Sequence, residues 1–353
     1  MKICELIIGG LIVAIVLFDV FQSVVVPRQT GRAFRIAPLL ARRFWLLWRQ
    51  IGLRLRLLQR REYFLGIFAP LALILELFVW VVSLIFGYGL MLHALHSQLR
   101  PITNDFGSAL YLAGASLFTL GFDAVRPTGV TRVIVLAAAA SGVAVMSLTI
   151  ALLFSLYSSF QRREVLVVLL DTRAGTPPSG LTLLETYTQL GLHSELPLAF
   201  AAWEVWSAEV FESHRAYPIL PYFRSNIDNN SWLSALGAVL DACTLLLTTV
   251  ESDDCQGAAQ LMHRTGCRVL LEFHRLFLLS ATDEVGVERE QFEFARASLA
   301  QAGFRLRHYD DAWRSFTQMR STYSASLYAK APVFRHASRA KSFKPREIAH
   351  RFS

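Results

Sequence analysis

The residues from Thr119 to Asp123, Thr-Leu-Gly-Phe-Asp, have the types and the position that can coordinate a cation at membrane depth. They lie between two apolar runs, residues 64–92 and 130–160, that are each long enough to span a bilayer. A short apolar segment, residues 107–118, precedes them and as a helix reaches only about halfway across. The C-terminal end of such a helix carries a partial negative charge, which favours a cation near the membrane centre. Because non-helical backbone at this depth must line water or protein, the pattern predicts a re-entrant segment beside a cavity.

Three apolar runs predict the elements that position this segment: residues 7–26, 64–92 and 130–160. Hydrophobic residues make up 54% of the 353 positions and charged residues only 18%, and the apolar excess lies in the first 160 positions. A signal peptide is the alternative for the first run, but no small-residue cleavage pattern follows it. The arginines of residues 28–61 and Arg162-Arg163 place those segments in the cytoplasm. We therefore expect the N-terminus outside and the C-terminal half inside.

Residues 64–163 resemble the pore of the potassium-channel (pore-loop cation channel) family, whose order is outer helix, pore helix, filter and inner helix. The match rests on Leu110-Tyr111-Leu112 in the pore helix and on Thr119-Leu120-Gly121-Phe122 for the family's Thr-Val-Gly-Tyr. The resemblance implies a homotetramer, because one chain supplies one pore segment, and potassium as the permeant ion. It also implies a gating hinge at Gly142 on the inner helix. The implied filter residues are Thr119, Leu120, Gly121, Phe122 and Asp123.

Asp123 is a departure from the family pattern, because it stands where the second filter glycine is expected. Glycine is used there for its positive φ, which Asp tolerates at a cost. Alternatively, one residue is deleted and Asp123 is the acid of the outer mouth. Four copies of Asp123 would favour cations in either case, whereas selectivity for potassium over sodium stays open. An ordinary extracellular loop is the alternative interpretation of residues 105–123.

Asp19 and Glu76 are ionisable residues within the first two spans. Such groups are costly in a bilayer and are functional candidates by default, for gating or for ion attraction. Pairing with a polar group on a neighbouring helix is the structural alternative. Gly87-Tyr88-Gly89 matches the family's filter triplet, but it lies inside a span without preceding threonines. We expect these glycines to permit close helix packing.

Residues 28–61 contain ten arginines and no acidic residue, with bulky apolar residues at near-helical spacing. This pattern predicts a helix that lies in the membrane interface and contacts anionic lipid. A voltage sensor is the alternative, but these arginines do not recur at every third position along an apolar span. The basic tail, residues 330–353, predicts disorder or contact with anionic lipid. We therefore expect the net charge of +8 to set the membrane topology and to bind anionic lipid, and not to bind nucleic acid.

The remaining residues, 164–329, predict a helical bundle with helices near 164–171, 181–191, 197–214, 230–250, 256–280, 286–302 and 308–329. The run 236–250 is too short to span and predicts a core helix. Residues 214–232 resemble a segment of bacterial ion-channel-like membrane proteins with helical C-terminal domains. We expect a turn with a cap from Asp228 or Asn230, or alternatively a ligand or gating contact.

Several function classes are disfavoured. Phosphate-binding, zinc-protease and nucleophile motifs are absent, so neither an enzyme nor a cofactor is expected. The four cysteines have no Cys-x-x-Cys spacing, so no metal site or disulfide is expected.

Together these patterns predict an all-α protein with a membrane part and a cytosolic bundle. The expected function is a tetrameric pore-loop cation channel of the inner (plasma) membrane, regulated by its cytosolic domain. The alternative is a non-conducting receptor or scaffold that keeps a degenerate pore. The predicted parts are a first transmembrane helix (1–27), an interfacial helix (28–61), a pore module (62–163), a cytosolic helical domain (164–329) and a basic tail (330–353).

Overall fold

The computed structural model describes residues 2–26, 36–54, 58–102, 104–121, 125–223, 231–251, 254–277 and 287–327. These residues are almost entirely helical, which confirms the all-α class; the named strands among them, β1 (Leu99–Arg100) and β2 (Arg126–Pro127), form one antiparallel pair. The chain divides into two compact units. Unit 1 comprises Met1–Ser158 and Arg215–Phe223, and unit 2 comprises Ser159–His214 and Arg224–Ser353.

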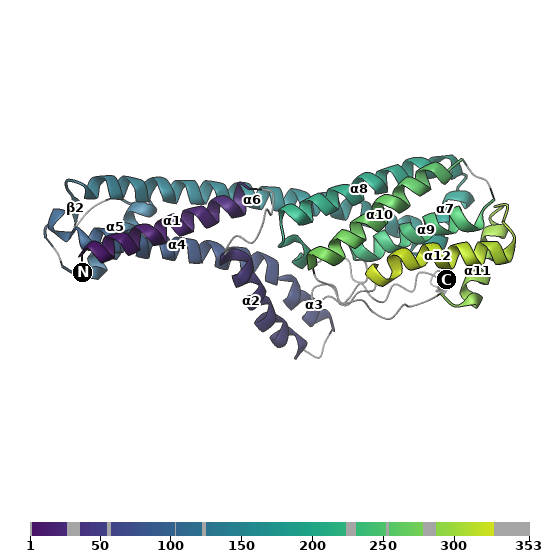
Figure 1. Ribbon diagram of the computed structural model, residues 1–353, viewed down its shortest axis with the longest axis horizontal. Helices are drawn as coiled ribbons and strands as arrows, with labels where there is room; N and C mark the ends of the chain where they lie inside the picture. The colour runs from purple at the N-terminus through teal and green to yellow at the C-terminus, as the bar shows by residue number, and fades with distance from the viewer. Residues whose placement is uncertain are drawn as a thin grey trace, which may run out of the picture. The chain divides into compact units, whose positions relative to one another are not determined.

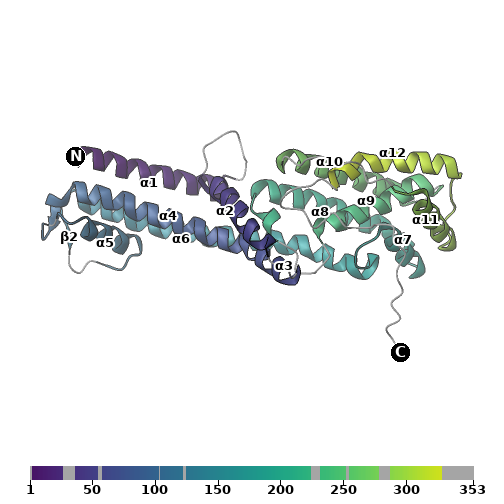
Figure 2. The ribbon, with the colours of Figure 1, turned by 90° about the horizontal axis from the view of Figure 1, so that it is seen from below.

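Unit 1 is built on three long apolar helices. They are α1 (Lys2–Val24), α4 (Phe68–Ala94) and the first part of α6 (Thr131–Ala174), and each is long and apolar enough to cross a membrane. Figures 1 and 2 show the three helices side by side, with the short α5 (Phe106–Leu117) beside α4. The predicted interfacial region contributes α2 (Ile36–Leu53) and α3 (Leu58–Gly66), while residues 27–35 lie outside the described residues.

Glycines let α4 approach its neighbours closely, as the sequence predicts. A Cβ on Gly87 would lie 2.9 Å from the Val13 Cγ2 of α1, and a Cβ on Gly89 would lie 2.8 Å from the Leu110 Cδ2 of α5. The Gly-Tyr-Gly triplet therefore serves helix packing. The core of unit 1 then continues through Leu84, Leu92 and Ala138, which are fully buried.

The helix α6 is longer than the sequence analysis expects. Residues 130–160 and 164–171 are predicted as separate helices, but the structure has one uninterrupted helix, Thr131–Ala174. The intervening Gln161-Arg162-Arg163-Glu164 consists of good helix formers, so the charges there do not end the helix.

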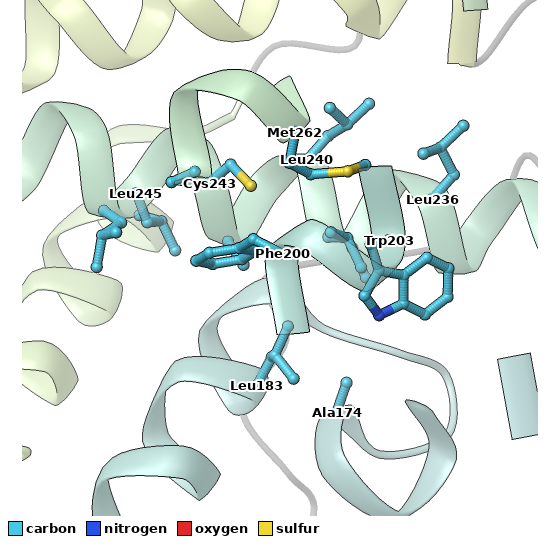
Figure 3. Close-up of a cluster of buried hydrophobic side chains, with 14 of the residues drawn as sticks. Ala174, Leu183, Phe200, Trp203, Leu236, Leu240, Cys243, Leu245 and Met262 are labelled. Atoms are coloured by element: carbon cyan, nitrogen blue, oxygen red, sulfur yellow. The ribbon is translucent and has the colours of Figure 1, made fainter. Parts of the chain in front are cut away.

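Unit 2 is a bundle around the buried helix α9 (Trp232–Thr249). Its other helices are α7 (Gly180–Gln189), α8 (Leu196–Ala216), α10 (Gln256–Phe277), α11 (Arg289–Gln301) and α12 (Tyr309–Leu327), which confirms the predicted helices to within a few residues. α9 is apolar enough to span a membrane, but 94% of its most apolar window is buried inside the protein. It is therefore a core helix, and Figure 3 shows its Leu240 and Cys243 in one cluster with Phe200 of α8 and Met262 of α10.

Two local features of unit 2 differ from expectation. Ser231 caps α9 through a capping box with Ser234, whereas the expected caps Asp228 and Asn230 lie outside the described residues. In addition, Arg215–Phe223 groups with unit 1, although the sequence assigns these residues to the cytosolic domain. The basic tail, residues 330–353, lies outside the described residues.

Candidate ion-conduction site

The N-terminus of the short helix α5 is fixed by Asp105. The Asp105 Oδ2 atom accepts hydrogen bonds from the backbone N of Ser108 at 2.7 Å and from the Ser108 hydroxyl at 2.9 Å. The first of these bonds satisfies an orphan backbone donor of the first turn, and the carboxylate also faces the positive end of the helix dipole. The side-chain and then the backbone hydrogen bond of Ser108 lower the pKa of the Asp105 carboxyl. Asp105 therefore stays ionised at neutral pH.

The other end of α5 is set by the inner helix. A Cβ on Gly142 would collide with the Leu117 carbonyl oxygen, so α6 and the last turn of α5 meet backbone to backbone. Leu117 is buried beside the fully buried Ala113 and Ala138. Gly142, which the sequence predicts as a gating hinge, thus has a separate packing role. The hinge role itself stays a prediction.

A Schellman turn ends α5 at the predicted filter. The backbone N of Leu120 bonds to the Ala115 carbonyl at 2.8 Å, and that of Thr119 bonds to the Ser116 carbonyl at 3.0 Å. Thr119 has φ 55°, the left-handed conformation that this motif requires and that a β-branched residue rarely adopts. The carbonyls of Thr119, Leu120 and Gly121 consequently lie beyond the helix.

The described part of the predicted filter, Thr119 to Gly121, is exposed in the single chain. The exposed fraction of Leu120 is 75%, and Thr119 and Gly121 are exposed as well. Gly121 has φ +94°, a conformation that favours glycine. Phe122 and Asp123, the remaining predicted filter residues, lie outside the described residues.

Gln98 anchors the connection that returns from the filter to α6. Its side-chain oxygen accepts from the backbone N of Val130 at 2.7 Å, and its carbonyl accepts from the Thr128 hydroxyl at 2.6 Å and from the Thr128 backbone N at 2.9 Å. The β1–β2 pairing reinforces this connection. The end of α4 and the start of α6 are therefore fixed to each other on the side where α5 begins.

A histidine links α1 to the start of the pore helix. The His93 Nδ1 atom lies 2.8 Å from the Glu5 Oε2 atom of α1, and its Nε2 atom lies 3.3 Å from the Asn104 carbonyl. Both partners are acceptors, so both contacts are hydrogen bonds only when the imidazole carries two protons. Asn104 directly precedes the cap Asp105.

The intramembrane acid Asp19 has a polar partner on a neighbouring helix. Its Oδ2 atom accepts from the Trp80 Nε1 at 2.9 Å, and the carboxylate is 3% exposed. Glu76 lies one turn from Trp80 on α4 and is half-buried. A similar bond joins α4 to α6, between the Tyr88 hydroxyl and the Ser141 hydroxyl at 2.7 Å. This bond gives a physical basis to the alternative expected for Asp19, which is pairing with a polar group on a neighbouring helix. A role of Asp19 in ion attraction stays a prediction.

The segment Arg215–Phe223 packs against the far end of the membrane helices. Leu220 is buried in a cluster with Leu152 and Leu156 of α6. The Tyr222 ring lies 5.1 Å from the Trp45 ring of α2 and 5.2 Å from the Phe68 ring of α4, measured between centroids. This segment therefore contacts both the predicted interfacial helix and the inner helix.

A buried polar cluster in unit 2 holds the extension of α6. The Arg163 side chain is 1% exposed, and its Nη2 lies 2.9 Å from the Glu164 Oε1. Its Nη1 lies 3.4 Å from the His214 Nε2, while the His214 Nδ1 lies 2.7 Å from the Val210 carbonyl. Burial, followed by the charge of Arg163, lowers the pKa of His214 to about 3. The ring is thus neutral, donating to Val210 and accepting from Arg163.

A second buried cluster joins α9 to α12. The Asp241 Oδ1 atom accepts from Arg320 Nε at 3.1 Å and from the Tyr323 hydroxyl at 2.5 Å. Burial and the adjacent Asp241 raise the pKa of Tyr323 well above its usual value. Since the side chains of Asp241 and Arg320 are 1% and 6% exposed, this is a structural ion pair of the bundle.

The structure brings together only some of the predicted site residues. Thr119, Leu120 and Gly121 form one segment that begins where α5 ends against Gly142. Asp19 and Glu76 lie on α1 and α4, where Asp19 accepts a hydrogen bond from Trp80. Sequence reasoning missed His93 and Ser141, because a single polar residue in an apolar run shows no partner. Within the described residues, no group of three His, Cys, Asp or Glu side chains could hold a metal ion.

Comparison with known families supports the interpretation of this region. Residues 71–159 match a family model described as an ion channel, and these residues include most of α4, all of α5 and α6 as far as Ser159. Comparison with curated proteins and with solved structures finds no match. The match supports an ion channel, and the three apolar helices, long enough to cross a membrane, are consistent with a membrane protein.

Proposed function

We propose that this protein is a homotetrameric pore-loop channel that conducts a monovalent cation, potassium by resemblance, under control of its cytosolic helical unit. The observation that carries the proposal is the half-length helix α5, which ends at an exposed Thr-Leu-Gly segment among three membrane-long helices. One chain supplies one such segment, and four would surround an axis. The match of residues 71–159 to an ion-channel family supports the same function.

The filter would coordinate the ion through backbone carbonyls of Thr119, Leu120, Gly121 and Phe122 and through the Thr119 hydroxyl. Carbonyl dipoles can replace the water shell of a monovalent cation. The negative end of the α5 dipole adds to this preference, because the Schellman turn places it next to Thr119. Asp123 of each copy would form the ring of acids at the outer mouth.

In the proposed topology, the protein lies in a bacterial-type inner membrane. Its N-terminus is outside, and unit 2 is on the cytoplasmic side. It rests on the positive-inside rule, because ten arginines fall in Arg28–Arg61 and two follow the inner span. In this topology α2 and α3 lie near the inner leaflet. Anionic lipid is the proposed partner of Arg28–Arg61 and of the basic tail.

The experiment that tests conduction is recording from purified protein in planar bilayers under bi-ionic potassium and sodium gradients. Gly121→Ala should abolish or strongly reduce the current, because its φ of +94° strains any L side chain. Gly10→Ala is the matched control, because a Cβ there meets nothing within 4 Å. No cation current from the wild type at any tested voltage, pH or lipid composition would refute the channel proposal.

A specific observation supports the alternative of a non-conducting receptor or scaffold. Thr119 adopts a strained left-handed conformation at the first filter position, and the family's second filter glycine is missing from Gly121-Phe122-Asp123. Both departures from the family pattern are compatible with a protein that keeps the fold of a pore but does not conduct ions. Wild-type protein that assembles into tetramers yet carries no current would favour this alternative.

A further inference from the structure

A buried hydrogen bond joins the two long helices that pack against the pore helix α5. The Tyr88 hydroxyl of α4 lies 2.7 Å from the Ser141 hydroxyl of α6, and the two residues are 3% and 8% exposed. Ser141 donates its own proton to the Ala137 carbonyl at 2.7 Å, one turn earlier on α6. Because a serine hydroxyl carries a single proton, Tyr88 is the donor and Ser141 the acceptor of the bond between the helices.

The residue after each of these two partners is a glycine, and each glycine contacts α5. A Cβ on Gly89 would lie 2.8 Å from the Leu110 Cδ2 and 3.4 Å from the Leu110 Cα. A Cβ on Gly142 would collide with the Leu117 carbonyl oxygen. Leu110 and Leu117 are seven residues apart and so lie on the same face of α5. This face therefore contacts α4 at one point and α6 at another, and the hydrogen bond joins α4 to α6 beside both points.

The position of α5 consequently depends on the distance between α4 and α6. At both glycines the helices approach α5 without an intervening side chain, so a small separation of α4 from α6 opens one of the two contacts. The bond opposes such a separation, because hydroxyls buried in an apolar core have no water to replace a lost partner. The predicted filter begins at Thr119, two residues beyond Leu117. A displacement at the end of α5 is thus transmitted to the filter.

We propose that Tyr88 and Ser141 are positioning residues for the filter. Their hydrogen bond fixes the spacing of α4 and α6, and this spacing determines where the end of α5 places the carbonyls of Thr119 to Gly121. The proposal rests on the proposed function, since it concerns a filter through which a cation passes. Both side chains are buried and act on the ion only through α5. Because coordination by carbonyls depends on where each oxygen lies, loss of the bond changes permeation.

The test compares Tyr88→Phe, Ser141→Ala and the double variant with the wild type in planar bilayers under bi-ionic potassium and sodium gradients. Each single variant should change the unitary conductance or the potassium-to-sodium permeability ratio roughly threefold or more, the size expected for one hydrogen bond between membrane helices. The double variant should be no more impaired than Ser141→Ala, because either substitution already removes the bond. Tyr63→Phe is the matched control at a 76% exposed position and should conduct like the wild type.

Thermal unfolding of the same variants in detergent separates positioning from a purely structural role. A bond that only stabilises the fold lowers the melting temperature but leaves the conductance and the permeability ratio of the folded oligomer at wild-type values. That result would overturn the proposal, as would additive effects of the two substitutions in the double variant. If Tyr88→Phe does not fold, Ser141→Ala alone gives the same comparison, because it removes a single oxygen atom.

The outcomes separate this inference from the proposed function. A wild type that conducts no cation refutes both. A conducting wild type whose conductance and permeability ratio survive in Tyr88→Phe and Ser141→Ala refutes only the positioning role.

Discussion

Acidification should destabilise unit 2 through His214, which is held as a neutral ring. Burial and the positive Arg163, whose Nη1 lies 3.4 Å from the His214 Nε2, lower the pKa of His214 from 6.5 to about 3. The other charged group of this cluster is Glu164, which pairs with Arg163. In the unfolded chain the same imidazole titrates near its ordinary value of about 6.5. The unfolded state therefore binds one more proton than the folded state between these two values.

The sign and size follow from this difference in bound protons. The free energy of unfolding falls as the pH falls below about 6.5, by about 1.4 kcal/mol per pH unit, until the folded ring itself titrates. Between about pH 6.5 and pH 5 the loss from His214 alone is about 2 kcal/mol. Above about pH 6.5 this contribution is constant, because the ring is neutral in both states.

The assay is urea unfolding of the full chain in detergent at several pH values, followed by tryptophan fluorescence. The Trp232 ring lies 5.1 Å from the His214 ring and reports on this site. Other acids and histidines also titrate, so the comparison is with His214→Gln, which keeps an acceptor for Arg163 but cannot titrate. The wild type should show the steeper loss, with a slope difference of about 1.4 kcal/mol per pH unit. Equal slopes would refute the reasoning, as would an NMR titration that puts His214 near pH 6.5.

Two further substitutions test the packing of the units. Arg320→Met should reduce the free energy of unfolding by about 3–5 kcal/mol, because it leaves the buried carboxylate of Asp241 without its cation, with only the Tyr323 hydroxyl still donating to it. Arg314→Met removes an exposed ion pair and should change it by less than about 1 kcal/mol in the same unfolding experiment. Tyr222→Ala should alter the voltage or lipid dependence of any wild-type current, because Tyr222 packs on the rings of α2 and α4. Tyr63→Ala, at an exposed position, should leave the current unchanged.

The sequence predicts most of the helices but few of the contacts. Apolar length and periodicity locate the spans and the bundle helices, because these signals are local and repeat over many residues. The continuous α6 was missed, since a charged Gln-Arg-Arg-Glu step looks like a boundary although it is compatible with a helix. The bond between His93 and Glu5, at 2.8 Å, joins residues far apart in the chain. Such a pair leaves no spacing pattern, so only the fold reveals it.

The packing of Gly142 bears directly on how gating can be inferred from this sequence. A glycine in the inner helix suggests a hinge, yet the Leu117 carbonyl occupies the space that a Cβ would need. Both roles predict that Gly142→Ala impairs the current, so this substitution alone cannot separate them. They differ in what restores function, because bending can be supplied by a glycine elsewhere in the helix, whereas the close approach cannot.

The double variant Gly142→Ala with Ala139→Gly therefore decides between the two roles. It returns a glycine to α6 one turn earlier, with the flexibility that glycine gives a helix, but it leaves the collision with the last turn of α5. If the packing role governs, current stays lost in the double variant, and Ala139→Gly alone conducts like the wild type. Recovery of current would instead establish the hinge. Because α5 ends at the proposed filter, the packing result would also mean that α6 positions this segment directly, through backbone contact at Leu117.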